Sequence, residues 1–257
     1  MALPAAGRPG RSSTERDWPR SGCPRAGHAG WSDLLNHTLH AGSPARAVLW
    51  DMDGTLLDSA EHHWLAWRAT LAAEGIELSH DRFLASFGQR NDTILRGHLG
   101  SAVPLAEIDR IGAAKEERYR ALVRERGIAL LPGVERWLKR LRAEGWRQAI
   151  ASAAPRPNVD VILAILDLAA CFQAIVSAED VRLGKPDPQV FLLAADRLAV
   201  PPRRCVVVED APQGIEAAHR GGMRAIGVRT SHPALEADIT VGTLAELPDD
   251  AFEEILP

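Results

Sequence analysis

Two carboxylates, Asp51 and Asp53, follow the apolar run AVLW and precede a Gly-Thr turn. Such a run is typical of a buried strand, and a turn at its end would direct both acids into a crevice. Two close carboxylates repel each other unless a proton or a cation lies between them. A hard divalent ion such as Mg²⁺, which prefers oxygen ligands, would relieve the repulsion and would also bind a phosphate. The alternative is a helix-capping aspartate beside a solvated one.

A second acidic pair, Glu209 and Asp210, directly follows the apolar run CVVV. Acids at the end of a buried strand are less typical of a solvated face than acids on a surface helix. We therefore expect this pair to converge with Asp51 on one cation. Oxygen-only ligation favours Mg²⁺ over zinc, so the sequence predicts a magnesium site.

The elements that must position these acids alternate between strand-like and helix-like segments from Ala45 onward. Apolar runs predict strands buried on both faces, and the amphipathic segments between them predict covering helices. Val134, Trp137 and Leu141, for example, recur on one helical face. The alternation predicts a doubly wound, Rossmann-like α/β core with a parallel sheet. The runs expected as strands are AVLW, RQAIAS, AIVSA, CVVVED, AIGV and ADITV.

A long stretch without strand character separates the first expected strand from the second. Its helical patterns end at glycines such as Gly75 and Gly127, which suit the left-handed position after a helix C-terminus. We predict an all-helical insert, or cap, over residues 60–130, flanked by core segments 45–59 and 131–257. An insert directly after the first strand lies over the carboxyl ends of the strands, where open α/β sheets bind ligands. The cap is therefore expected to act as a lid.

The composition excludes several classes of function. The 257 residues are 46% hydrophobic and 25% charged, which is ordinary for a soluble globular protein. A formal net charge of -4 provides no electrostatic footprint for nucleic acid, and no apolar run reaches the roughly 18 residues of a membrane span. The three cysteines lack metal-ligand spacing, and we expect a cytoplasmic monomer, with a dimer left open. Residues 1–44 show no sustained period and are expected to form a disordered N-terminal extension.

The segment DMDGTLLDS resembles the first motif of the haloacid dehalogenase superfamily of phosphohydrolases and phosphomutases. Three further motifs follow in the order of that family, namely AIASAA, GKPDPQVF and VVVEDAPQGIEAA. The resemblance covers about residues 45 to 230. Four ordered motifs make it specific.

The resemblance implies a role for each motif residue. Asp51 would be the nucleophile that forms an aspartyl-phosphate, and Asp53 would be the general acid and base, with its backbone carbonyl also facing the metal. Ser152 would bind the phosphoryl group, and Lys185 would neutralise the nucleophile and the phosphate. The ED pair would complete the Mg²⁺ site. Without the resemblance, Ser152 could cap the following helix and Lys185 could be a solvated loop lysine.

The helical insert and the ED pair are similar to the branch that includes β-phosphoglucomutase and related sugar-phosphate phosphatases. This similarity implies that His63 is a hinge histidine and that Arg90, in FGQRNDTIL, holds the distal part of the substrate. It also implies that Lys115 and Tyr119, in KEERY, contact the substrate side. The alternative for His63 and Lys115 is a solvated helix face. Trp67 is expected in the core of the insert.

The residues after Ser152 favour one reaction of this branch. They read AAPRPN, whereas β-phosphoglucomutase has a second serine and a lysine in the next positions. Ala154 and Pro155 supply neither hydroxyl nor charge, although Arg156 could supply charge to the substrate. We therefore predict a Mg²⁺-dependent phosphatase for a small phosphorylated metabolite such as a sugar phosphate. A phosphomutase is the alternative, and a catalytically silent regulatory module is the least favoured.

Overall fold

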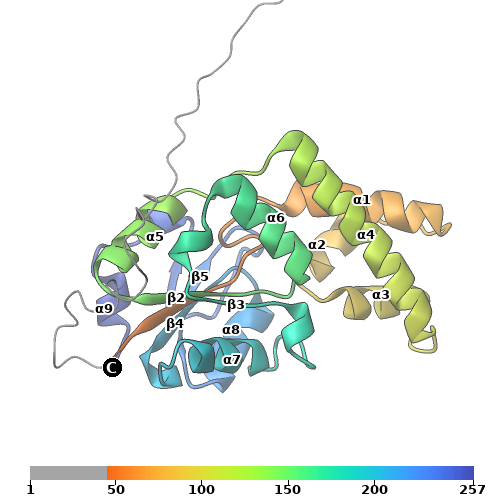
Figure 1. Cartoon of the computed structure of the whole chain (residues 1–257). Coiled ribbons are helices and arrows are strands. Elements are labelled where there is room, and N and C mark those ends of the chain that lie inside the picture. Colours follow the sequence, from red (N-terminus) through yellow and green to blue (C-terminus); the bar gives the residue numbers. More distant parts are fainter. Residues whose placement is uncertain (1–44) are drawn as a thin grey trace, which may run out of the picture.

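A computed structural model describes residues 45–257, and Figure 1 shows them as a sheet domain with a helical domain beside it. The expected N-terminal extension, residues 1–44, lies outside the described residues. Six strands form one parallel sheet in the order β3-β2-β1-β4-β5-β6, which confirms the predicted doubly wound, Rossmann-like core. The strands are β1 (Ala47–Trp50), β2 (Arg147–Ala151), β3 (Ala174–Val176), β4 (Cys205–Glu209), β5 (Arg224–Val228) and β6 (Ile239–Val241).

Helices cover both faces of the sheet. They are α5 (Val134–Ala143), α6 (Arg156–Leu166), α7 (Gln189–Arg197), α8 (Pro212–Arg220) and α9 (Ala251–Glu254). Val48 and Trp50 of β1 pack with α5, α6 and α9, whereas Ala47 and Leu49 pack with α7 and α8. Because successive side chains of a strand point to opposite faces, a strand covered on both faces must be apolar throughout. This is why AVLW contains no polar residue.

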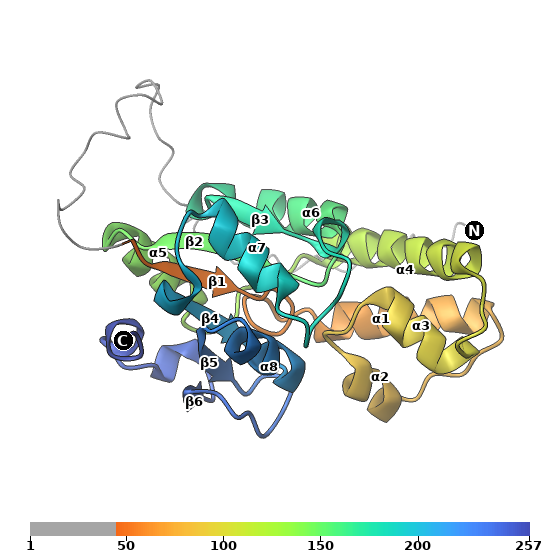
Figure 2. The ribbon, with the colours of Figure 1, turned by 90° about the horizontal axis from the view of Figure 1, so that it is seen from below.

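Four helices between β1 and α5 form the cap. They are α1 (Ala60–Ala73), α2 (His80–Ser86), α3 (Asn91–Leu99) and α4 (Leu105–Arg126). The cap has its own apolar cluster, which includes Trp67, Leu71 and Ile108. Helix α1 packs along α4, and α4 in turn packs on α6 of the sheet domain, as Figure 2 shows. Among the described residues, no helix combines the length and the apolar character that crossing a membrane requires.

Two linkers join the cap to the sheet domain, and they run side by side. The N–H of Asp58 donates to the carbonyl of Ala129 at 3.2 Å, and the N–H of Leu131 donates to the carbonyl of Leu56 at 3.0 Å. The chain therefore leaves and re-enters the sheet domain at one place, just after β1. Parallel strands present their carboxyl ends at one edge of the sheet, so the cap lies over the ends that carry the motif residues.

Candidate active site

The buried centre of the site is an ion pair between Lys185 and two acids. Asp51 follows β1 and Glu209 ends β4, and these two strands are neighbours in the sheet. The Nζ of Lys185 lies 2.5 Å from Oδ1 of Asp51 and 2.5 Å from Oε1 of Glu209. Burial opposes a charge on this lysine, but the two carboxylates outweigh burial and raise the pKa of Lys185. The lysine is therefore a fixed positive charge beside Asp51.

Three buried carboxylates converge here, and a bound cation would relieve the repulsion between them. The ligand atoms of Asp51, Glu209 and Asp210 all lie within 4.8 Å of one another. Burial raises the pKa of Asp51 to about 8, with the charge of Lys185 lowering it and that of Glu209 raising it further. Burial and the neighbouring carboxylates also raise the pKa of Asp210 well above its usual range. Oxygen donors that crowd together in this way fit the predicted Mg²⁺.

The turn after Asp53 leaves room for the acidic cluster. Gly54 has a φ of 83°, and a Cβ at this position would lie 2.0 Å from Oδ2 of Asp210. Thr55 Oγ1 donates to Asp210 Oδ1 at 3.5 Å, and the hydroxyl of Ser231 also bonds to the Asp210 carboxylate. Ser231 was not predicted, because it lies beyond β5 and outside every motif. Ligation of the metal by the backbone carbonyl of Asp53 remains a prediction.

Ser152 follows β2 and is only 2% exposed. Its hydroxyl oxygen accepts a hydrogen bond from the N–H of Ala154 at 3.0 Å. This contact leaves the hydroxyl proton free to be donated to another group. Ser152 and Asp51 line the same cavity, so the serine can donate to an oxygen of a ligand that binds beside Asp51. The helix that follows, α6, has no side-chain cap, so Ser152 does not have the capping role.

Asp53 faces the cap, where a short chain of hydrogen bonds holds it. Nε2 of His63 lies 3.1 Å from Oδ1 of Asp53, and Nδ1 of His63 lies 2.8 Å from Nζ of Lys115. Burial and Lys115 lower the pKa of His63, so the imidazole is neutral near pH 7. The lysine ammonium donates to Nδ1, which assigns the imidazole proton to Nε2, where it is donated to Asp53. Burial alone would raise the pKa of Asp53, but the contacts with His63 hold it below its usual value.

Three residues that carry this chain further were not predicted from the sequence. Glu116 Oε1 accepts from Lys115 at 2.9 Å and from Asn91 at 2.8 Å, and its Oε2 accepts from Asn158 of α6 at 2.6 Å. Glu116 is 5% exposed and Asn158 is fully buried. Within KEERY, Glu116 resembles any acid of a charged helix face. Only the packing of α4 on α6 gives it a buried partner in the sheet domain.

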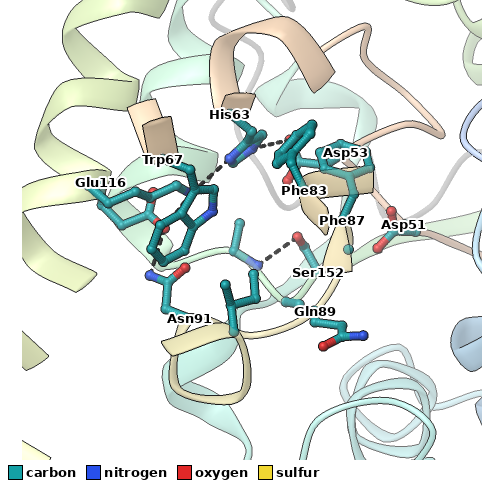
Figure 3. A pocket seen from close by; sticks show the side chains of 15 residues that line it. Asp51, Asp53, His63, Trp67, Phe83, Phe87, Gln89, Asn91, Glu116 and Ser152 are labelled. Atoms are coloured by element: carbon teal, nitrogen blue, oxygen red, sulfur yellow. Dashed lines mark hydrogen bonds and ion pairs between the residues drawn. The ribbon is translucent and has the colours of Figure 1, made fainter. Parts of the chain in front are cut away.

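A small cavity lies between the sheet domain and the cap. Figure 3 shows Asp51 and Ser152 together with the aromatic side chains of Trp67, Phe83 and Phe87 in its lining. Trp67, expected in the core of the insert, belongs to the apolar cluster of the cap and also contacts the cavity. The cavity volume is about 40 Å³, which holds only about three water molecules. This space is too small for a ligand larger than a few water molecules.

The two arginines expected to bind substrate lie outside the lining of this cavity. Arg90 Nη1 donates to the carbonyls of Ala178 and Val181, each at 3.1 Å, in the loop after β3. Arg156 forms an exposed ion pair with Asp160 at 2.7 Å, one helical turn away on α6. Substrate binding by Arg90 and Arg156 remains a prediction. In the closed arrangement, Arg90 connects the cap to the sheet domain, and the charge of Arg156 is paired at the surface.

The sequence matches a family model described as haloacid dehalogenase-like hydrolase over residues 45–222. A β-phosphoglucomutase of Bacillus subtilis is 35% identical over 218 residues, which cover 81% of this chain and 94% of that protein. A fructose-1-phosphate phosphatase of Escherichia coli is 33% identical over 186 residues, covering 71% of this chain and 95% of that protein. The family model and both relatives extend across the sheet domain and the cap.

The fold is similar to that of solved structures from the same branch. A crystal structure of β-phosphoglucomutase from Clostridium difficile superposes with a TM-score of 0.75 at 26% sequence identity. The match covers 82% of this chain and 96% of that one. The fold is therefore shared along almost the whole length of that protein.

Proposed function

Because this chain belongs to the haloacid dehalogenase-like hydrolases, whose relatives act on phosphate esters, we propose that it is a Mg²⁺-dependent phosphatase of small phosphorylated metabolites. The observation that carries the proposal is the contact of 2.5 Å between Lys185 and Asp51, whose carboxylate lines the cavity between the sheet domain and the cap. A buried lysine beside a buried carboxylate fits a nucleophile that must approach a negatively charged phosphate.

The reaction divides into two displacements at phosphorus. In the first, an oxygen of Asp51 forms a bond to phosphorus, and the bond from phosphorus to the ester oxygen breaks. Asp53 gives its proton to that leaving oxygen, and the product alcohol departs. In the second, Asp53 takes a proton from water as the water oxygen bonds to phosphorus and the bond to Asp51 breaks. Aspartyl-phosphate formation and breakdown thus sum to ester hydrolysis.

The residues around Asp51 supply charge and position. Lys185 neutralises the attacking carboxylate and the phosphate, and Ser152 donates its hydroxyl proton to a phosphoryl oxygen. A Mg²⁺ held by Asp51, Glu209 and Asp210 would add positive charge at the phosphate when it is bound. Bound phosphate raises the pKa of Asp53 through its negative charge, which prepares Asp53 to carry the proton.

A sugar phosphomutase is the second candidate, favoured by the 35% identity to a β-phosphoglucomutase. A mutase must hold a bisphosphate while it turns round, and this requires anion ligands in addition to those for the reacting phosphate. Ala154 and Pro155 supply none, which supports hydrolysis. The relative named as a fructose-1-phosphate phosphatase supports a sugar phosphate as the substrate class. We also propose a cytoplasmic monomer, because three cysteines without paired or metal-ligand spacing are typical of a protein from a reducing compartment.

The test is a panel of phosphorylated metabolites assayed for phosphate release, run beside an assay for isomerisation of glucose 1-phosphate. We expect phosphate release that depends on Asp51 and no net isomerisation. Isomerisation that outpaces phosphate release would replace the phosphatase with the mutase. Beryllium fluoride, which mimics a phosphoryl group on a carboxylate, should bind to the wild type and not to the Asp51→Asn variant.

A further inference from the structure

The substrate class of this site can be narrowed from the charges that line its cavity, an inference that rests on the proposed phosphatase function. Beside the acids of the reaction centre, the lining contains two side chains that can carry positive charge, His63 and Lys115. Both lie on the cap side. Any group of the substrate that extends away from Asp51 meets these two residues and their neighbours.

Neither of these side chains offers a free positive charge to a ligand. The ammonium of Lys115 donates to Nδ1 of His63 at 2.8 Å and to Oε1 of Glu116 at 2.9 Å. Lys115 is 2% exposed, so this ion pair is shielded from water and strong. Burial opposes the charge of Glu116, but Lys115 and a hydrogen bond from Asn158 outweigh it and lower the pKa of Glu116. Glu116 therefore cancels the charge of Lys115 inside the cavity wall.

Arg90 lies outside this lining and instead lines a smaller neighbouring pocket beside Ser152 and Lys185. Its guanidinium donates to the carbonyls of Ala178 and Val181, and its aliphatic stem packs over Gly184. A Cβ on Gly184 would lie 2.6 Å from Cδ of Arg90, so the arginine and the loop are in close contact. The guanidinium already has two backbone acceptors, and a second phosphate of a substrate would have to displace them.

The remaining lining is apolar or neutral. Trp67, Phe87 and Ile94 contribute apolar surface, and Gln89 and Asn91 contribute amides. Gln89 lies in this lining, and its amide can serve a ligand. Aromatic surface with a few neutral donors and acceptors suits a hydroxylated, uncharged group better than an ionic one.

We propose that this enzyme is selective for monophosphate esters whose leaving group is neutral, and that Glu116 enforces the selection. A second phosphate would be enclosed beside the Glu116 carboxylate with no unpaired cation in the lining. A buried charge without a partner is strongly unfavourable, and a like charge adds repulsion. The neutral wall accepts hydroxyl groups instead. Glu116 is thus a specificity-determining residue that acts by excluding bisphosphates.

The experiment compares matched esters that differ only in a second phosphate, namely fructose 1-phosphate with fructose 1,6-bisphosphate, and glucose 1-phosphate with glucose 1,6-bisphosphate. Phosphate release is measured for each with the Mg²⁺-loaded wild-type protein. The monophosphate of any pair that is hydrolysed should have a kcat/KM at least about tenfold higher than its bisphosphate. Equal or faster hydrolysis of the bisphosphate would overturn the selection while leaving the phosphatase function intact.

The variant Glu116→Gln tests the assigned residue. It removes the charge that pairs with Lys115, so the bisphosphate-to-monophosphate ratio of kcat/KM should rise by about tenfold. The ratio compares two substrates on one preparation, so partial loss of folded protein cancels. Glu117→Gln is the matched control, because Glu117 is the next residue of α4 but is exposed, and its ratio should not change. An unchanged ratio of kcat/KM in Glu116→Gln would show that Glu116 does not determine the specificity.

The two levels of inference fail in different ways. If no ester of either pair releases phosphate and beryllium fluoride does not bind at Asp51, the phosphatase function itself is wrong, and the selection falls with it. If beryllium fluoride binds and only bisphosphates are hydrolysed, the assignment of the reaction centre stands, and the proposed selection against bisphosphates is wrong.

Discussion

The active site has two halves that are built differently. In the sheet domain, Asp51, Glu209 and Asp210 crowd around one lysine and leave an excess of negative charge that calls for a cation. In the cap, Lys115 and Glu116 neutralise each other within the wall. The first half is poised to bind a metal and a phosphate, and the second is poised to enclose a neutral group. The chemistry and the choice of substrate are therefore assigned to separate domains.

Asp51 and Asp53 show this difference at the scale of two neighbouring carboxylates. Asp51 faces the acids of the sheet domain, and burial raises its pKa to about 8. Asp53 faces the cap, where His63 holds its pKa below the usual value. Environments that separate the pKa values of two carboxylates in this way are typical of sites that give the two carboxylates different roles. In the proposed mechanism, the nucleophile Asp51 therefore belongs to the sheet-domain half, and the cap half controls the pKa of the proton carrier Asp53.

The largest effect is expected from the sheet-domain half. Asp51→Asn should lower kcat by at least roughly 10⁴-fold, because an amide cannot attack phosphorus. The same change removes one of three crowded carboxylates, so the metal-free variant should be at least as stable as the wild type. Steady-state kinetics and thermal unfolding measure the two outcomes. Turnover at the normal rate would end the assignment of Asp51 as nucleophile.

Removal of divalent cations should also abolish turnover, but reversibly. We expect activity to stop in excess chelator and to return when Mg²⁺ is added, because the acidic cluster binds through oxygen alone. Mg²⁺ should raise the melting temperature of the wild type, since a ligand of the folded state stabilises it. Asp210→Asn is the control, because it should lose both the rescue and the thermal shift. Full activity in chelator would rule out this metal site.

The cap half is tested by Arg90→Ala. Its contacts with the loop after β3 predict a loss in kcat/KM of about tenfold for a sugar phosphate and for p-nitrophenyl phosphate alike, because closure of the cap is weakened for every substrate. Arg96→Ala is a matched control, since Arg96 donates to a carbonyl within the cap and should have little effect. A loss confined to the sugar phosphate would instead support the prediction that Arg90 binds substrate.

The smallest effect is expected in the loop after β3, whose backbone carbonyls accept hydrogen bonds from Arg90 of the cap. Asp180 accepts from Arg197, Ser177 and the Ser177 N–H, and the pKa of Asp180 is lowered to about 2, first of all by its hydrogen bond with Arg197. A lowered carboxyl pKa means that its stabilisation is present above the unfolded value of 3.8 and is lost as the pH falls through about 2.

Asp180→Asn should therefore destabilise the protein by about 1 kcal/mol at pH 7, a modest value because the ion pair is partly exposed. The difference from the wild type should shrink as the pH falls from 4 towards 2. Urea unfolding at a series of pH values measures it. Asp196→Asn, at an exposed position of α7, is the control and should show no such trend. A pH-independent difference would mean that the ion pair does not stabilise this loop.

The strands of the sheet domain, and the positions of the site residues that follow them, could be predicted from the sequence alone. Six apolar runs were enough to predict the six strands, and the residues that follow them were expected to meet because parallel strands present their carboxyl ends at one edge. Asp51, Ser152, Glu209 and Asp210 lie where this rule puts them. Their positions depend on local strand geometry, which is encoded within a few residues of each.

The contacts of the cap residues, by contrast, became known only from the tertiary structure. Glu116 and Asn158 meet across the boundary between the cap and the sheet domain, 42 positions apart in the sequence, because α4 packs on α6. Arg90 reaches backbone carbonyls, which any sequence would supply. A charged helix face and a substrate-facing wall have the same pattern of residue types, and helix packing alone determines which of them is buried. The reaction centre is thus readable from local order along the chain, whereas selection of the substrate depends on how two domains close.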